Sequence, residues 1–327
     1  MKITFDPDLE TIHDLPKVES WPATKHQFDA RSVWAVRTAL AARRPLLVRG
    51  EPGIGKSQLA RAAAAELRVP FLSQVINSRC ECEDLLYHYD AVSRLAQAQV
   101  LGTSRRATGW EKDLEPGRFV RPGLLWWAFD WESARAQAVR FCSQCPEPEQ
   151  PKGWSPGEGC VVLIDEIDKA DSDLPNGLLE SLGNTGFHVP PANTSVALRD
   201  QAVPPLVIVT TNEERELPAA FLRRCLVLQI ALPDGEAELT EFLIGRARVH
   251  TGKGVVTETV YRETARQLVQ DREQARRLGQ AKPGAAEYLD LIRALAELHP
   301  GDEAEQLKAL KQIRDFALHK HPEEPLA

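Results

Sequence analysis

Long apolar runs and cationic segments are both missing from this sequence. No stretch of the 327 residues approaches the roughly 20 consecutive apolar residues that cross a membrane. The first segment, MKITFDPDLETIHDLPKVES, carries acidic residues where a signal peptide needs a cationic end and an apolar core. We therefore expect a cytoplasmic protein with no membrane segment.

Positive charge is also scarce relative to negative charge. The chain has 40 Lys and Arg against 47 Asp and Glu, a net charge of −7, and no segment gathers the basic residues into a nucleic-acid-binding arm. This composition disfavours tight, sequence-independent DNA binding, although a local basic patch formed by assembly stays open. The 43% hydrophobic content is ordinary for a globular chain long enough for two packed domains.

Cysteine is too sparse for a clear metal signature. Only Cys142 and Cys145 have CxxC spacing, and Cys80 with Cys82 could in principle complete a four-thiolate zinc site. No second CxxC and no neighbouring histidine support that site. Ordinary reduced thiols are the competing interpretation.

A glycine-punctuated loop is the strongest motif in the chain. GEPGIGKS, residues 50–57, fits G-x-x-x-x-G-K-[ST] without a mismatch, between the apolar run 46–48 and a predicted helix over 56–67. In a P-loop, backbone N–H groups and the helix N-terminus hold a polyphosphate. The predicted nucleotide-binding residues are Gly50, Glu51, Pro52, Gly53, Ile54, Gly55, Lys56, Ser57 and Gln58. Lys56 would reach the outer phosphates of ATP, and Ser57 would be a magnesium ligand.

Two adjacent acids follow a predicted buried strand about a hundred residues later. Asp165 and Glu166 end the run CVVLIDE, and ligands gather at the carboxyl ends of parallel strands. Asp165 would hold Mg²⁺, and Glu166 would orient and deprotonate a water for attack on the γ-phosphate. A solvated helix start is the alternative for an isolated Asp-Glu pair.

Further candidates follow the next predicted strand, 205–210. Asn212 at its end would lie beside the same phosphate, although Asn there is also ordinary turn chemistry. Arg223 and Arg224 follow a helical segment and are candidates for a finger inserted into a neighbouring subunit's nucleotide. A surface pair bridging nearby acids is the alternative for these arginines.

The predicted architecture is α/β, a doubly wound parallel sheet with a C-terminal helical lid. Apolar runs at 46–48, 70–76, 160–164 and 205–210 predict its strands, and helical periodicity fills 28–42, 236–245, 257–270, 284–298 and 302–319. The predicted domains are a loose N-terminal extension (1–22), a nucleotide-binding domain (23–232) with a Trp-rich insertion at about 88–159, and a helical lid (233–327). The insertion's LLWWAF run suggests core packing, and Trp110 beside Arg105, Arg106 and Lys112 suggests a contact loop.

Together these motifs resemble the AAA+ ATPases, and within them the MoxR family close to the dynein-related group. The resemblance covers about residues 20–320 and includes GEPGIGKS, VVLIDEIDKA, GLLESLGNTGFHVP and TTNEERELPAAFLRRC. It implies ATP and Mg²⁺ as ligands, rings that are commonly hexameric, and nucleotide bound between subunits. Asn212 would be the sensor-1 residue, and Arg224, or else Arg223, the trans-acting finger. Residues 183–197 would form a hairpin facing the ring's pore.

The resemblance also implies a function. Family members typically remodel protein partners, often beside a protein with a von Willebrand factor A domain. A nucleotide-dependent assembly switch is the second hypothesis, and a nucleic-acid motor is a third that the acidic charge disfavours. One departure stands out, because the family's lid arginine is expected near Gly284. Lys282 or Arg277 are the candidates to replace it.

Overall fold

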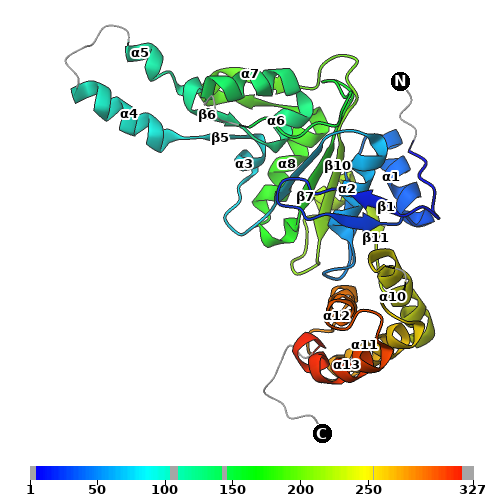
Figure 1. Ribbon diagram of the computed structural model, residues 1–327. Coiled ribbons are helices and arrows are strands. Elements are labelled where there is room, and N and C mark those ends of the chain that lie inside the picture. Colours follow the sequence, from blue (N-terminus) through cyan, green and yellow to red (C-terminus); the bar gives the residue numbers. More distant parts are fainter. Residues whose placement is uncertain (1–4, 104–109, 142–145, 253, 319–327) are drawn as a thin grey trace. The chain divides into compact units, whose positions relative to one another are not determined.

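The computed structural model describes residues 5–103, 110–141, 146–252 and 254–318, which form two compact units (Figure 1). The first unit contains Asp29–Arg49 and Ser57–Leu228. The second contains Asp8–Phe28, the loop Gly50–Lys56 and the chain from Gln229 onward. No helix within the described ranges is long and apolar enough to cross a membrane.

A five-stranded sheet is the centre of the first unit; four of its strands match the predicted apolar runs, and the edge strand β11 was not predicted. Its strand order is β11-β3-β10-β7-β4, and the pairs β3–β10, β10–β7 and β7–β4 are parallel. The strands are β3 (Leu46–Arg49), β4 (Phe71–Val75), β7 (Val161–Asp165), β10 (Leu206–Thr211) and β11 (Leu226–Gln229). Every residue of β7 and β10 is buried, which explains their continuous apolar sequences.

Helices flank this sheet in the sequence order expected of a doubly wound fold. They are α1 (Ala30–Ala42), α2 (Lys56–Leu67), α8 (Asp173–Asn184) and α9 (Ala219–Arg224), with a 3-10 turn at Ile167–Lys169. Asp29 caps α1, since its carboxylate accepts a hydrogen bond from the Ser32 amide at 2.9 Å. Helix α2 matches the predicted range, and α1 begins two residues later than predicted.

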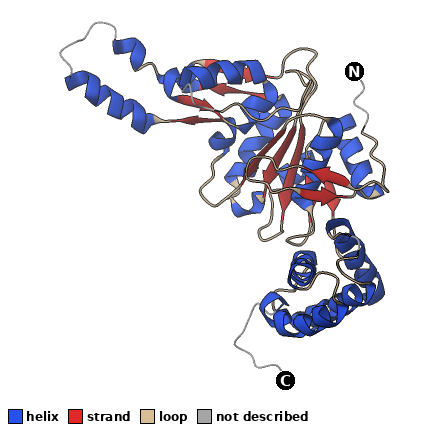
Figure 2. Ribbon diagram, in the orientation of Figure 1, coloured by secondary structure: helices blue, strands red, loops and turns tan. Residues whose placement is uncertain are grey.

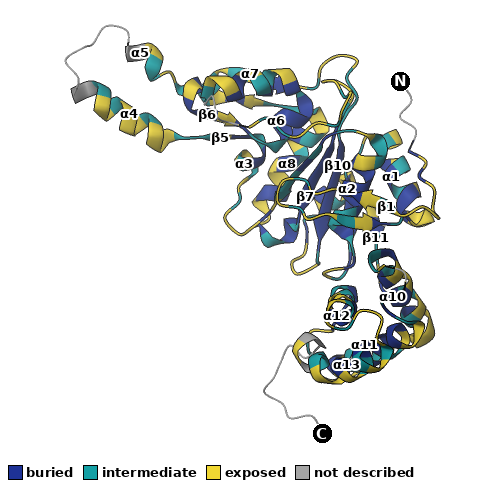
Figure 3. Cartoon of the chain, viewed as in Figure 1, coloured by how far each residue is buried: buried dark blue, intermediate teal, exposed yellow. Residues whose placement is uncertain are grey.

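The Trp-rich insertion between β4 and β7 has its own secondary structure. It contains α3 (Cys82–Leu86), β5 (Tyr87–Tyr89), α4 (Ala91–Thr103), α5 (Trp110–Asp113), a 3-10 turn (Pro116–Phe119), β6 (Val120–Pro122), α6 (Leu124–Phe129) and α7 (Trp131–Phe141). Strands β5 and β6 pair antiparallel, and α4 extends from them away from the sheet with an exposed surface (Figures 1 and 3).

The two tryptophans of the LLWWAF run are core residues, as that run suggested. Trp126 and Trp127 are buried in the first unit's core, on a helix that packs against β4 and β7. The Trp131 ring packs edge-on against Trp127 and Trp154, with centroids 5.2 and 4.7 Å apart. Arg105 and Arg106 lie outside the described residues, so the contact-loop prediction for Trp110 is untested.

The predicted hairpin at residues 183–197 is present. Strands β8 (Gly186–Val189) and β9 (Thr194–Ala197) pair antiparallel around a 3-10 turn at Pro190–Ala192. Val189 and Val196 are buried against the core, and the Phe187 ring meets Trp126 at 6.3 Å. The hairpin therefore packs on the tryptophan core through the middle of its strands and through Val189, next to the turn.

The second unit is mainly helical, and no strand follows Gln229 in the described part of the chain (Figure 2). Its helices are α10 (Glu236–His250), α11 (Glu258–Leu278), α12 (Ala285–Leu298) and α13 (Glu303–Leu318). Their apolar faces form one core around Tyr288, whose hydroxyl donates to the Tyr261 carbonyl at 3.1 Å. The four predicted helices are confirmed, with α10 and α11 extending further than predicted.

The expectation of a loose N-terminal segment is wrong. Strands β1 (His13–Leu15) and β2 (Thr24–His26) form an antiparallel hairpin, and β2 packs against α10. Leu15 and Phe28 are buried, and the rings of His13 and His26 meet Phe28 edge-on. Three-residue strands are too short for an alternating apolar pattern to reveal, which explains the error.

Candidate nucleotide site at the carboxyl edge of the sheet

The loop Gly50–Lys56 has the backbone geometry that its glycines predict. Gly53 and Gly55 have φ angles of 73° and 101°, which lie in the region that favours glycine. The buried Lys56 ammonium donates hydrogen bonds to the carbonyls of Gly50 at 2.7 Å and Glu51 at 2.9 Å. The lysine thus curls back over the loop, where a polyphosphate would be held.

Ser57 follows directly at the start of α2 and meets the first acid of the predicted pair. Its hydroxyl lies 2.8 and 3.0 Å from the two carboxylate oxygens of Asp165. The Thr210 hydroxyl, on the neighbouring strand, donates to Asp165 at 2.5 Å. These convergent oxygens are the donor type that Mg²⁺ prefers, so the residues present fit the ion.

Glu166 comes directly after β7 in a left-handed conformation, with φ 59° and ψ 48°. Its amide donates to the Thr210 hydroxyl at 2.9 Å, and its carboxylate accepts from the Asn212 amide at 3.2 Å. The other carboxylate oxygen is 2.5 Å from the Lys169 ammonium. Left-handed backbone in a non-glycine residue is strained, and such strain concentrates at functional sites.

Three supporting residues of this cluster were missed by sequence reasoning. Asp168 is buried and accepts hydrogen bonds from the amides of Asn212 at 3.2 Å and Glu214 at 2.9 Å. Thr210 bridges Asp165 and Glu166, and hydrogen bonding to Glu166 raises the pKa of Lys169. The sequence DEIDK (165–169) could have pointed to two of them, because Asp168 and Lys169 follow the acid pair within three residues.

The structure therefore brings Ser57, Asp165, Glu166 and Asn212 into one hydrogen-bonded group. A family model for the AAA domain (dynein-related subfamily) matches residues 45–225, which is more than half of the chain. The chain belongs to this AAA family. It is accordingly a nucleotide-binding ATPase with the parallel sheet and helical region described above.

The AAA chain also matches solved structures at low identity. A putative ATPase from Cytophaga hutchinsonii ATCC 33406 is 13% identical, with 88% of this chain and 79% of that chain covered and a TM-score of 0.36. A RuvB mutant from Thermotoga maritima is 15% identical, with 88% and 75% covered and a TM-score of 0.37. Because both TM-scores are low, the assignment rests on the family model. No curated protein matches the sequence.

The candidate finger residues of the AAA domain are exposed at the end of α9. Arg223 and Arg224 are its last two residues, and the buried Cys225 follows them. The Arg44 guanidinium caps this helix end, donating to the carbonyls of Arg223, of Arg224 at 3.1 Å and of Cys225 at 3.2 Å. Their backbone is thus held in place while both side chains stay accessible.

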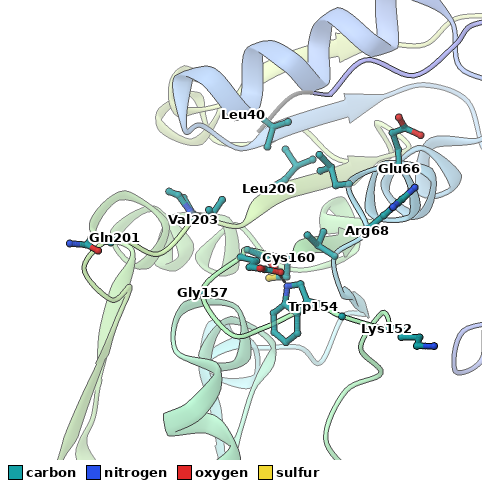
Figure 4. Close-up of a pocket in the computed structure, with 16 residues that line it drawn as sticks. Leu40, Glu66, Arg68, Lys152, Trp154, Gly157, Cys160, Gln201, Val203 and Leu206 are labelled. Carbon is teal, nitrogen blue, oxygen red and sulfur yellow. Dashed lines mark hydrogen bonds between the residues drawn. The ribbon is translucent and has the colours of Figure 1, made fainter. Parts of the chain in front are cut away.

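The AAA domain also has a cavity of about 580 Å³ at the opposite end of the sheet (Figure 4). It is lined by Cys160 and Leu206, which lie at the amino ends of β7 and β10, and by Trp154, whose indole donates to the Gly159 carbonyl at 2.9 Å. Since the predicted nucleotide residues lie at the carboxyl ends, this cavity is separate from them.

The zinc alternative gains no support from the described cysteines. Cys80 and Cys82 pack against the core, and burial raises the pKa of Cys82 to about 11, which disfavours the thiolate that zinc needs. Within the described ranges, no group of three or more His, Cys, Asp or Glu residues could hold a metal. Cys142 and Cys145 lie outside those ranges, so the four-cysteine site itself is untested.

Proposed function

We propose that this ATPase is MoxR-like, binds ATP with Mg²⁺ at residues 50–58, and uses hydrolysis to remodel or activate a protein partner. The observation that carries the proposal is the hydrogen-bonded convergence of Ser57, Asp165, Glu166 and Asn212 at one edge of the sheet. Ser57 and Asp165 would hold Mg²⁺, which would neutralise charge on the phosphates. The phosphates themselves would be held by the N–H groups of the loop and by Lys56.

The proposed reaction needs one water and one base. Glu166 takes a proton as the water oxygen bonds to the γ-phosphorus, and the bond from that phosphorus to the bridging oxygen breaks to release ADP. Asn212 lies 3.2 Å from the Glu166 carboxylate, so its amide can orient the same water. The Thr210 hydroxyl and the Asp168 carboxylate accept hydrogen bonds from the backbone amides of Glu166 and Asn212. These bonds fix the positions of the two residues, which supports catalysis by positioning.

We further propose that Arg224, with Arg223 as the alternative, completes the site of a neighbouring subunit. Both side chains are exposed, and the Arg44 cap fixes the helix end that carries them. An always-charged guanidinium suits the developing charge on a transferring phosphoryl group. This arrangement requires a ring, for which the family resemblance suggests a hexamer.

The partner is proposed from the resemblance, as a protein that carries a von Willebrand factor A domain. The hairpin β8–β9 is proposed to face the ring's pore, and the buried Val189 and Val196 connect it to the core of the first unit. A cytoplasmic location and the domain boundaries 1–22, 23–232 and 233–327 stay predictions. Nucleic acid is not the proposed substrate, given the net charge of −7.

One observation favours the second hypothesis, an ATP-dependent assembly switch with slow hydrolysis. Both carboxylate oxygens of Glu166 are occupied, one by Asn212 and one by Lys169. An attacking water must share these oxygens with Asn212 and Lys169 or displace one of the two contacts. If a partner is needed for that displacement, the isolated protein would assemble on ATP but hydrolyse it slowly.

Mixing two inactive variants tests the shared site. We would measure ATP turnover per subunit for Glu166→Gln, for Arg224→Ala and for their mixture over a range of concentrations. In the mixture, an intact finger from the first variant can meet an intact acid from the second. Recovered turnover that rises with concentration is expected, whereas a mixture as inactive as its components would contradict a finger at position 224. Arg223→Ala in the same assay tests the alternative.

A further inference from the structure

One residue of the phosphate loop is held by a distant arginine. The Glu51 carboxylate accepts two hydrogen bonds from Arg272 of α11, Nη1 to Oε2 at 2.9 Å and Nη2 to Oε1 at 3.0 Å. The two residues are 221 positions apart, and the Arg272 side chain is only 13% exposed. Paired bonds of this kind fix the orientation of the carboxylate as well as its distance.

Glu51 also touches the lysine of the loop. Its backbone carbonyl accepts a hydrogen bond from the Lys56 ammonium at 2.9 Å, while its side chain is bound by Arg272. A single residue therefore lies between the phosphate-binding lysine and helix α11. A movement of the Glu51 side chain would shift the Glu51 backbone carbonyl, to which the Lys56 ammonium is hydrogen-bonded.

Helix α12 supports the same loop at a second point. Arg272 donates a further hydrogen bond to the Pro283 carbonyl at 2.6 Å, directly before the Gly284 cap of α12. A Cβ atom on Gly53 would lie 2.3 Å from the Ala286 methyl, so the loop approaches α12 more closely than any other residue would allow. Arg272 thus ties the loop and the start of α12 together.

The arginine that the resemblance expects near Gly284 has no counterpart there. Of the two replacement candidates, Arg277 is 77% exposed and pairs with Glu273 at 3.9 Å, and Lys282 lines a cavity with Arg277 and Glu273. The helical-region arginine that contacts the phosphate loop is Arg272, one and a half turns before Arg277. The Arg272 guanidinium contacts the carboxylate of Glu51, which belongs to the loop.

We propose that Arg272 is a positioning residue that sets the phosphate loop through Glu51, in place of a lid arginine near Gly284. Because Arg272 acts on the loop, its loss weakens binding of ATP and ADP alike. An arginine that contacted the γ-phosphate would affect ATP alone. This inference rests on the proposed role of residues 50–57 as the phosphate-binding loop.

Nucleotide binding by the full-length chain tests the proposal. We would measure the Kd of fluorescently labelled ATP and ADP for the wild type, Arg272→Ala, Arg272→Lys, Glu51→Gln and the Arg272→Ala, Glu51→Gln double variant. Arg266→Ala is the matched control, since Arg266 lies on the same helix in an exposed pair with Glu263 at 2.7 Å. The unfolding temperature without nucleotide identifies any variant that fails to fold. If Arg272→Ala fails to fold, Arg272→Lys still tests the proposal, because lysine keeps the positive charge but cannot make the paired hydrogen bonds to Glu51.

The expected result is about a tenfold rise in Kd for both nucleotides in Arg272→Ala and Glu51→Gln, with no further rise in the double variant. Arg272→Lys would be intermediate, and Arg266→Ala unchanged. Loss of ATP binding alone, additive losses, or an unchanged Kd in a folded Arg272→Ala would overturn the inference. Failure of the wild type to bind, or normal binding by Lys56→Ala, would instead reject the proposed nucleotide loop.

Discussion

The acid cluster (Asp165 and Glu166) and the phosphate loop are held in place by partners that lie at different distances along the sequence. Asp165 and Glu166 are fixed by Thr210 and Lys169, which lie on the next strand and one turn away. Glu51 in the loop is fixed by Arg272, 221 residues later in the chain. The acid cluster is therefore held by residues of the first unit, whereas the loop is held by an arginine of the C-terminal helices.

This difference predicts that the two regions affect different steps, hydrolysis and nucleotide binding. Substitutions of Glu166 and Asn212 should change the rate of hydrolysis and leave nucleotide binding nearly intact, because these two side chains act on water. Substitutions around the loop should change binding first, because the loop holds the phosphates whether or not hydrolysis follows.

Lys56→Ala should raise the Kd for ATP by about 100-fold or more, because charge-assisted hydrogen bonds to the outer phosphates are lost. Equilibrium binding of labelled ATP measures the effect, and Lys56→Arg shows how much a retained charge restores. If Lys56→Ala bound ATP normally but failed to hydrolyse it, the loop would act on the rate of hydrolysis alone, which would contradict the separation of the two effects.

Asn212→Ala should lower kcat by about 100-fold while changing the Kd for ATP less than about threefold, because the amide orients the attacking water. Steady-state turnover and labelled-ATP binding give the two numbers. Asn176→Ala, at an exposed position on α8, is the control. A loss confined to binding would assign Asn212 to the phosphate loop's role instead.

Thr210→Val should lower the free energy of unfolding by about 1–3 kcal/mol and slow turnover about tenfold, because a buried hydroxyl that bridges Asp165 and Glu166 is replaced by a methyl group. Thr211→Val is a matched control, since the Thr211 hydroxyl accepts one bond from the Glu213 amide at 3.0 Å. Chemical denaturation and turnover separate the effects. Equal loss of turnover in both variants would mean that strand stability alone matters.

Lys169→Met should raise turnover by the isolated protein only about two- to threefold, because an ion pair this open to solvent is weak. The pKa of Lys169 is raised, so the pair is complete below the ordinary lysine value of about 10.5 and is lost only as pH rises through the higher folded value. The variant's advantage should therefore persist from pH 7 to 9. A fall in turnover would show that Lys169 assists the reaction.

The parts of the fold that could be predicted are those in which neighbouring residues carry the signal. Continuous apolar runs located β3, β4, β7 and β10 to within about a residue, because strands buried on both faces have no polar alternation. Helical periodicity located α10 to α13. The hairpin at 13–26 was missed because its strands are three residues long and gain their stability from packing against α10.

The same distinction applies to the site. Ser57, Asp165, Glu166 and Asn212 could be predicted because each follows a strand or loop whose end is visible in the sequence. Arg272 could not, because its partner Glu51 lies 221 positions away and α11 carries several other arginines in exposed pairs. No local pattern distinguishes the arginine that reaches the loop from those that pair along the helix.

Hydrolysis of ATP at this edge of the sheet depends, in this mechanism, on Glu166 as the base. The most direct test measures ATP turnover and labelled-ATP binding side by side for the wild type and Glu166→Gln, each at concentrations that allow assembly. We predict that the substitution lowers turnover by at least about 100-fold and leaves the Kd for ATP within about threefold. A Glu166→Gln protein that hydrolyses ATP at the wild-type rate would contradict the account.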